Sequence, residues 1–152
     1  MSTGAGTGAT PGVRSLSGPF SGSWVLRVDG HPAQQGSKRH VGRGVMVEMD
    51  KKLPAWRAAI RAAVVAAGFH ELGLDFPLHV QATWYLPAPA RSKFGDLPAG
   101  PPDLDKLQRA LGDGLTLAGM IHDDARITRW SPAKRWALDD PYALVTIRED
   151  TP

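Results

Sequence analysis

Residues 102–127 read PDLDKLQRALGDGLTLAGMIHDDARI and hold the clearest helical periodicity in the chain. Apolar residues recur at helical spacing along this stretch, at Leu104, Leu107, Leu111, Leu115 and Ala118. Asp103 follows a proline and can cap the first turn with its side-chain oxygen, and Gly119 can end the last turn. The pattern therefore predicts a helix over 104–118 with one apolar face turned to a core.

The segments on either side of this helix predict strands and one further helix. Residues 24–29, 78–86 and 142–147 alternate apolar with other side chains, and we also predict strands at 45–49 and 127–136. An alanine-rich amphipathic helix is predicted to begin at Pro54 and to end before Gly68. This order predicts the α+β class, as a single small domain in which a mixed β-sheet packs with two main helices.

The two ends of the chain differ in composition. Six glycines stand among the first 23 residues, which are otherwise mostly Ser, Thr and Ala and can bury little apolar surface. We therefore predict a flexible Gly/Ser-rich tail over 1–23 and a folded domain over 24–152. Residues 87–102 contain several prolines and read as a long loop, a feature that is usually functional or mobile in a small domain.

Composition excludes several classes of protein. The 152 residues include no cysteine, which excludes a disulfide scaffold, a thiol nucleophile and a cysteine zinc site. The most apolar run, residues 62–68, is far shorter than the roughly 18 residues that a spanning helix needs, so we expect no membrane segment. Residues 1–23 lack the basic start and apolar centre of a secretory signal. We expect a cytoplasmic protein, since absence of cysteine is compatible with a reducing compartment.

Charge is segregated along the chain. The formal net charge is +3, but the stretch from Asp103 to Asp124 carries −3 and the remainder +6. Such an arrangement suits an enzyme that holds a hard cation while it binds a polyanion.

Each carboxylate in the acidic stretch also has an ordinary structural explanation. Asp103 can be a helix cap, and Asp105 stands where the helix dipole favours an acid. Asp105 can also form a solvated ion pair with Arg109, four residues further on. Asp113 is expected to be exposed, and Asp123–Asp124 can be surface residues of a loop.

The combination of these acids is more specific than any one of them. Asp103 and Asp105 stand at a loop-to-helix junction, and Asp124 ends the segment that returns from the same helix. Three converging carboxylates without His or Cys would favour Mg²⁺ or Mn²⁺ over zinc. In phosphodiester hydrolysis such ions activate a water and neutralise developing charge, which Arg109 or Lys106 can also stabilise.

The same stretch resembles the RusA family of Holliday-junction resolvases, which are crossover junction endodeoxyribonucleases. The family pattern runs Asp-x-Asp-Asn-Leu-x-Lys, then an Asp-Ala-Leu turn of helix, then Gly and an Asp-Asp pair before a strand. The resemblance covers roughly residues 24 to 149, including a glycine- and lysine-bearing loop at residues 30–38. It implies a small bacterial or phage-encoded homodimer that makes paired symmetric nicks in four-way DNA junctions with Mg²⁺ or Mn²⁺, in DNA recombination and repair.

By position, the resemblance implies that Asp103, Asp105 and Asp124 are the metal-binding catalytic acids. Lys106 stands where the family has asparagine, and Arg109 where it has its catalytic lysine. Arginine keeps the positive charge but presents a planar fork and donates no proton at ordinary pH. A role for Arg109 in catalysis is expected, and Lys106 is a second candidate for the missing ammonium group.

Basic residues outside and within the acidic stretch predict contacts with DNA phosphates, which are independent of base sequence. The predicted DNA-binding residues are Lys38, Arg39, Arg43, Lys106, Lys134 and Arg135. Phe94, in the proline-rich loop, can wedge against bases at a branch point or anchor the loop.

Three functions are compatible with this sequence. The first is a metal-dependent, structure-selective endodeoxyribonuclease that resolves Holliday junctions. The second is a junction-binding or DNA-binding protein whose catalysis is weak or lost because arginine replaces the family lysine. The third is a small-molecule phosphohydrolase.

Overall fold

The computed structural model describes residues 14–16, 22–36 and 43–152. The elements follow one another as β1 (Arg14–Leu16), β2 (Gly22–Asp29), α1 (Arg43–Ala67), β3 (Leu78–Leu86), α2 (Leu104–Leu117), the short 3-10 helix η2 (Asp124–Arg126), β4 (Ile127–Trp136) and β5 (Tyr142–Glu149). No helix within these residues is both long and apolar enough to cross a membrane.

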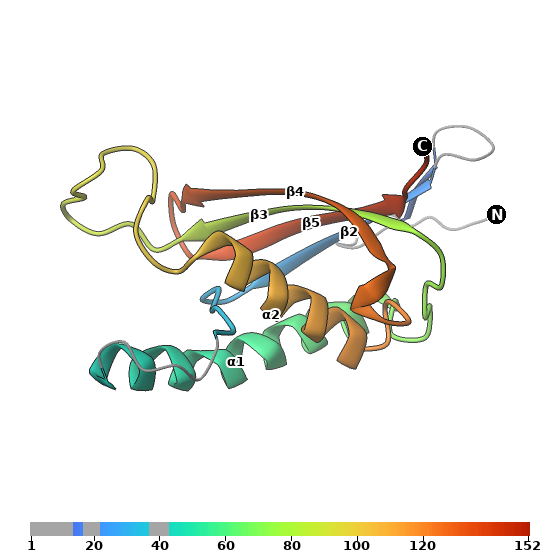
Figure 1. Cartoon of the computed structure of the whole chain (residues 1–152), viewed down its shortest axis with the longest axis horizontal. Coiled ribbons are helices and arrows are strands. Elements are labelled where there is room, and N and C mark those ends of the chain that lie inside the picture. The colour runs from blue at the N-terminus through green and yellow to red at the C-terminus, as the bar shows by residue number, and fades with distance from the viewer. Residues whose placement is uncertain (1–13, 17–21, 37–42) are drawn as a thin grey trace.

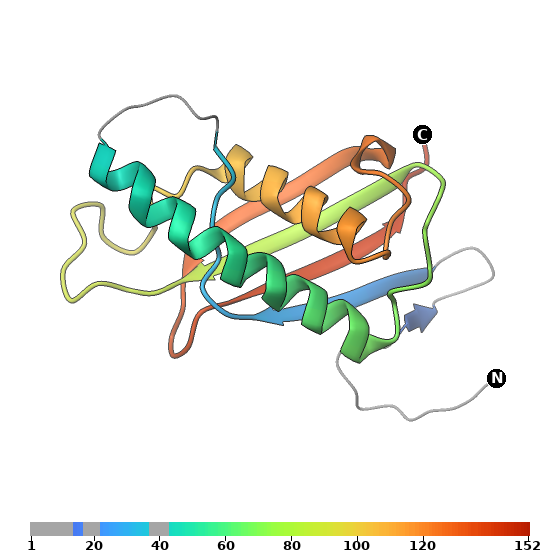
Figure 2. The same ribbon diagram turned by 90° about the horizontal axis from the view of Figure 1, so that it is seen from below.

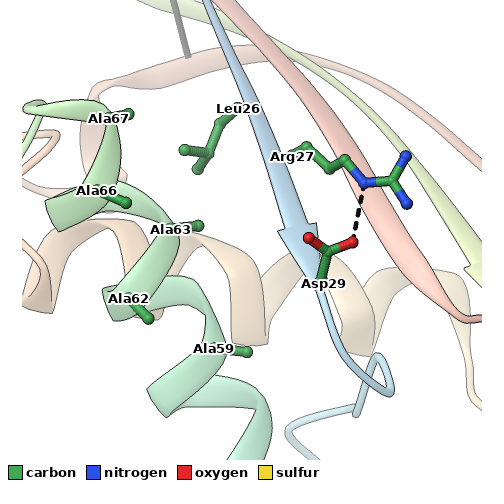
Figure 3. Close-up of a pocket in the computed structure, with 8 residues that line it drawn as sticks. All are labelled: Leu26, Arg27, Asp29, Ala59, Ala62, Ala63, Ala66 and Ala67. Atoms are coloured by element: carbon green, nitrogen blue, oxygen red, sulfur yellow. Dashed lines mark hydrogen bonds and ion pairs between the residues drawn. The ribbon is translucent and has the colours of Figure 1, made fainter. Parts of the chain in front are cut away.

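The strands form one mixed sheet of five strands in the order β1-β2-β5-β3-β4. The β3 and β4 strands are parallel, and the other neighbouring pairs are antiparallel. Both helices lie on the same face of the sheet (Figures 1 and 2), and α1 runs beside β2 with a row of alanines turned toward it (Figure 3). The prediction of a single α+β domain with a mixed sheet and two helices is confirmed.

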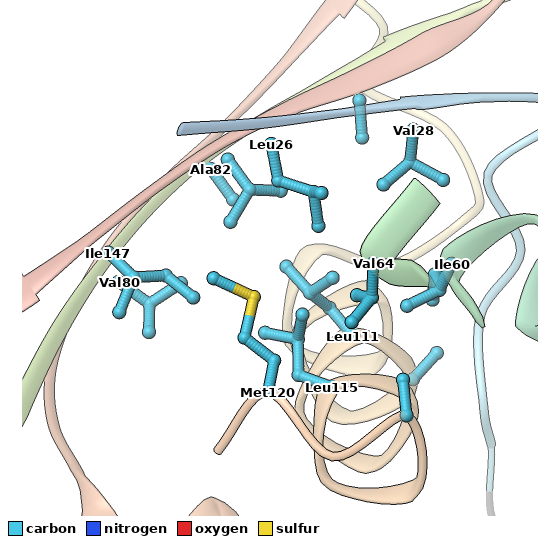
Figure 4. Close-up of a cluster of buried hydrophobic side chains, with 14 of the residues drawn as sticks. Leu26, Val28, Ile60, Val64, Val80, Ala82, Leu111, Leu115, Met120 and Ile147 are labelled. Carbon is cyan, nitrogen blue, oxygen red and sulfur yellow. The ribbon is translucent and has the colours of Figure 1, made fainter. Parts of the chain in front are cut away.

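The core lies between the sheet and the two helices. Alternating residues of β2, β3 and β5 point inward and meet apolar residues of α1 and α2, with Met120 filling the space between them (Figure 4). The helices approach closely at Gly114, where a Cβ atom would stand 2.7 Å from Cδ1 of Ile60. Gly114 therefore sets how near α2 lies to α1.

Four of the predicted strands and the helix at 104–118 are confirmed, with ends that differ by no more than two residues. The strand predicted at 45–49 is wrong, because these residues belong to α1, which begins at Arg43 and not at Pro54. A short apolar run has no periodicity that separates a strand from a helical segment. Pro54 lies within α1 on an exposed position, so water can hydrate the carbonyl that it leaves unbonded.

The predicted tail over 1–23 includes sheet residues. Arg14–Leu16 form β1, and β2 begins at Gly22, which pairs with Leu16. Residues 1–13 and 17–21 lie outside the described residues.

Candidate active site

An open cavity of about 260 Å³ lies where α2, η2 and β4 meet. It is lined by Asp105, Gln108, Arg109, Gly112, Asp124, Ile127 and Trp130. The four α2 residues share one helix face, since they stand at positions i, i+3, i+4 and i+7, and this face differs from the buried leucine face. The cavity therefore combines two carboxylates and a guanidinium from separate elements.

Asp124 reaches this cavity because Gly112 has no side chain. A Cβ atom at position 112 would stand 3.3 Å from Cβ of Asp124, closer than most packed side chains approach. The short η2 helix can therefore lie directly against the backbone of α2. The prediction that the acidic pair returns to the same helix agrees with this contact for Asp124.

Two further acids surround Asp124. The pKa of Asp124 is raised, and burial is the largest cause. Hydrogen bonding to Asp123 and the negative charges of Asp113 and Asp123 raise it further. The expectation that Asp113 is exposed is wrong, because its side chain is only 34% exposed and its Oδ2 lies 4.0 Å from NH2 of Arg57. The family pattern signals this residue, because Asp113-Gly-Leu stands where the family has Asp-Ala-Leu.

Asp103 points to a different partner. It occupies the N-cap position of α2 with extended backbone angles, but its side chain makes no capping hydrogen bond, so the predicted side-chain cap is wrong. Its Oδ2 instead accepts a hydrogen bond from Nζ of Lys106 at 2.8 Å. Its backbone N–H donates to Oε1 of Gln34 at 2.6 Å. Asp103 does not line the cavity that Asp105 and Asp124 share.

The acidic residues of the described chain form no group of three or more His, Asp or Glu side chains arranged to hold a metal ion. The set of Asp103, Asp105 and Asp124 as three metal ligands stays a prediction. The predicted ion pair between Asp105 and Arg109 is not formed, and Arg109 has no ion pair with any residue that the structure describes.

Lys106 helps to hold the loop that follows β2 against α2. The hydrogen bond to Asp103, together with its negative charge, raises the pKa of Lys106. The carbonyl of Lys106 accepts a hydrogen bond from the backbone N–H of Gln35 at 3.1 Å. Oε1 of Gln35 in turn accepts a hydrogen bond from NH2 of Arg57 at 2.6 Å. Residues 30–36 are thereby attached to both helices beside the start of α2.

The predicted DNA-binding residues other than Lys106 differ in their surroundings. Nζ of Lys134 donates to the carbonyls of Gly100 and Pro102, each at 2.9 Å, and so joins β4 to the loop before α2. Arg135 is exposed on β4. Lys38 and Arg39 lie outside the described residues, and Arg43 is the first residue of α1.

The loop between β3 and α2 projects beyond the end of the sheet (Figure 1). Phe94, within this loop, is 55% exposed, and Nζ of Lys93 lies 5.5 Å from the centre of its ring. The loop is held to β4 by Nε1 of Trp136, which donates to the carbonyl of Gly95 at 3.0 Å.

A larger cavity of about 370 Å³ lies between α1 and β2 (Figure 3). Five alanines of α1 line it together with Leu26, Arg27 and Asp29 of β2. Nε of Arg27 and Oδ1 of Asp29 lie 2.8 Å apart and form an ion pair with each other. The lining provides neither a nucleophile nor an unpaired acid, so this cavity is not the candidate active site.

The fold and the acidic cavity define a small α+β protein whose charged site is suited to the hydrolysis of a phosphate ester. The chain matches the family model described as Endodeoxyribonuclease RusA over residues 29–148. It belongs to this family, the Holliday-junction resolvases. A comparison with curated proteins found no match.

Proposed function

We propose that this protein is a Mg²⁺- or Mn²⁺-dependent, structure-selective endodeoxyribonuclease that resolves Holliday junctions by paired symmetric nicks in DNA recombination and repair. One observation carries the proposal: within a RusA-family domain, Asp105 and Asp124 come from separate elements to line one cavity beside Arg109. The substrate is DNA in the cytoplasm of a bacterium or of a cell infected by a phage.

The donors in the cavity fit a hard divalent cation. Mg²⁺ is usually held by one or two carboxylates, with water and substrate phosphates completing its shell, and Asp105 with Asp124 can supply that number. Asp113 and Asp123 add negative charge beside Asp124 and contribute, after burial, to its raised pKa, and a bound cation would offset that charge. When bound, the ion would activate a water and neutralise charge on the phosphate. Asp103 joins this set only if it leaves Lys106.

The protein's own cations complete the proposed chemistry. Arg109 lies in the cavity without an ion pair to a described residue, so its planar fork is available to the phosphate oxygens. Gln108 lines the same cavity and can donate a hydrogen bond to a phosphate. The predicted DNA-binding residues Lys38, Arg39, Arg43, Lys106, Lys134 and Arg135 are expected to contact phosphates of the junction, Lys106 and Lys134 after they exchange their present protein partners.

The proposed enzyme is a homodimer, because two symmetric nicks suit two active sites related by a two-fold axis. Light scattering at the concentrations used for nicking should report twice the mass of one chain. A monomer under those conditions contradicts paired nicking by one assembly.

A nicking assay tests the function. Wild-type protein should nick a synthetic four-way junction with Mg²⁺ or Mn²⁺, nick a linear duplex of the same sequence far more slowly, and stop in EDTA. Asp105→Asn should lower the nicking rate at least about 100-fold, the scale of losing a charge-stabilising group from an active site. Asp139→Asn, in the exposed turn between β4 and β5, is the matched control and should keep the wild-type rate. Equal nicking by Asp105→Asn would overturn the assignment of the site.

A second candidate is a junction-binding protein whose catalysis is weak or lost. It is favoured by one observation: the ammonium of Lys106 is held by Asp103, so neither lysine nor a free third carboxylate stands in the cavity. Under this hypothesis the junction shifts in a gel but stays intact, and Arg109→Lys restores nicking. No gain with Arg109→Lys would contradict it.

A further inference from the structure

The sheet face opposite the helices is exposed, and strand register arranges its side chains in rows. On β2, β3 and β5 the buried residues turn toward the helices, so the residues between them turn outward. Register aligns Arg148 of β5, His79 of β3 and Arg129 of β4 in one row. A second row, near the other end of the strands, holds Asp29, Tyr142, Tyr85 and Arg135.

The first row concentrates positive charge. Adjacent strands are about 4.8 Å apart, so His79 stands between two arginines. The pKa of His79 is lowered, mainly by burial and then by the positive charges of Arg148 and Arg129. The negative charge of Asp150 raises it. Nε2 of His79 lies 2.8 Å from Oγ of Ser131, which adds a hydroxyl group to the row.

The other end of the face combines cations with aromatic rings. The rings of Tyr85 and Tyr142 stack with their centres 4.4 Å apart. The guanidinium of Arg27 lies 3.8 Å from the centre of the Tyr142 ring. Arg135 is exposed beside Tyr85 in the neighbouring strand.

The face as a whole is positive. Its arginines are Arg27, Arg129, Arg135 and Arg148, and its carboxylates are Asp29 and Asp150, which pair with Arg27 and Arg129. Arg135 and Arg148 form no ion pair with a described residue, and their side chains donate to the carbonyl of Lys134 and to Gln81. Two guanidinium groups, at opposite ends of the sheet, thus lack a neutralising acid.

Strand β4 connects this face with the acidic cavity. It is an edge strand, and its residues Ile127 and Trp130 line the cavity. Arg129 and Arg135 of the same strand lie in the rows of the open face. A branched polyanion that crosses the β4 edge therefore meets both surfaces.

We propose that the open sheet face is a second DNA-binding surface, on which Arg148 and Arg135 hold the phosphates of one junction arm while a neighbouring arm lies in the cavity. This inference rests on the proposed function. Charge favours DNA over a second copy of the chain, because two such faces would bring like charges together. Guanidinium groups bind phosphates through paired hydrogen bonds without reading bases, as recognition of a junction's shape requires.

Salt-dependent binding tests the surface. Fluorescence anisotropy with a labelled four-way junction in EDTA measures affinity without cleavage, for the full chain and for Arg148→Gln, Arg135→Gln and the double variant. The double variant should bind at least about tenfold more weakly, and its plot of log K against log salt should be shallower by about 0.9 for each phosphate that the protein no longer neutralises. Arg61→Gln, an exposed arginine of α1, is the matched control and should bind within twofold of wild type.

A second variant covers the case in which the arginine variants do not fold. Leu144 is 41% exposed at the middle of the face, so Leu144→Glu should weaken binding by placing a negative charge against the phosphates.

Wild-type affinity and salt slope in the folded variants overturn the inference, as does a change of oligomeric state in place of a change in binding. Nicking by wild-type protein with Mg²⁺ or Mn²⁺ is scored separately. Unchanged binding by the variants with normal nicking therefore refutes the surface alone, whereas absence of nicking refutes the proposed function.

Discussion

The two helices lie on the same sheet face, and each borders a cavity near one edge of the sheet, but the two cavities differ in chemistry. Beside β2 the lining is mostly alanine, and the charges of Arg27 and Asp29 neutralise each other at 2.8 Å. Beside β4 two carboxylates and Arg109 line the cavity, and Arg109 forms no ion pair with a described residue. Only the cavity beside β4 has a charged side chain without an ion pair to a described residue, and this charge indicates catalysis.

A glycine in α2 accounts for much of this difference. Gly112 lets Asp124 lie against the helix, whereas the alanines of α1 present only methyl groups toward β2. Two glycines of α2, two positions apart, therefore permit its close contacts with α1, at Gly114, and with the acidic loop, at Gly112.

The largest expected effect is in the cavity beside β4. Asp124→Asn should lower nicking of a four-way junction at least about 100-fold. It should also raise the melting temperature without divalent cations, because the raised pKa of Asp124 means that its charged form costs stability above its ordinary pKa. Nicking assays and thermal unfolding measure the two effects.

The cavity beside β2 supplies the matched control for that variant. Ala62→Ser lies in the alanine-lined cavity and should leave nicking within twofold of wild type. If Ala62→Ser lowered nicking as much as Asp124→Asn, the cavity beside β4 would not be more important for activity than the cavity beside β2.

The next effect concerns the contact that holds the two helices together. Gly114→Ala should lower the free energy of unfolding by about 1–2 kcal/mol, because overpacking against Ile60 outweighs the gain in helix propensity. Denaturant unfolding measures it, with Gly100→Ala as the control, since a Cβ atom there meets nothing within 4 Å. Equal stability of the two variants would show that α1 and α2 can separate without cost.

A smaller change is expected two residues earlier in the same helix. Gly112→Ala adds a methyl group 3.3 Å from Cβ of Asp124 and should shift that carboxylate by a few tenths of an ångström. We expect nicking to fall about 3- to 10-fold, since catalytic geometry is sensitive on this scale, with no decrease in thermal stability. Lower stability with unchanged nicking would instead assign Gly112 to packing alone.

The smallest effect is a pH dependence next to the cavity. The hydrogen bond from Arg126 lowers the pKa of Asp75, so this pair stabilises the fold above the ordinary pKa of Asp75, and the contribution disappears as pH falls through its folded-state pKa. Asp75→Asn should therefore melt slightly below wild type at pH 7, and the difference should shrink as the pH falls below the ordinary pKa of Asp75. A difference that persists in acid would point to a cause other than the ion pair.

Sequence periodicity predicts most of the fold. The helix at 104–118 and four strands are recognisable because their apolar residues repeat over several turns or alternate along the strand. The first part of α1 is not recognisable as a helix from the sequence, because its apolar run is short and because a proline such as Pro54 is typical of a helix start.

The candidate site is predictable only in part, because it depends on contacts between distant residues. Asp105 and Asp124 are expected at one place, and they line one cavity. The ion pair of Asp103 with Lys106 follows from their spacing of three residues in a helix, but the family resemblance assigns Asp103 to the metal-binding acids instead. The basic rows of the open face depend on which strands are neighbours, and local periodicity carries no information about strand order.

If the cavity beside β4 holds the divalent cation of a nuclease, anomalous diffraction from a Mn²⁺-soaked crystal should locate the ion there. We expect a manganese peak in contact with carboxylate oxygens of Asp105 and Asp124, and this peak should disappear in Asp124→Asn. A cavity without manganese in a protein that nicks junctions with Mn²⁺, or a peak only at another cluster of acids, would contradict this expectation.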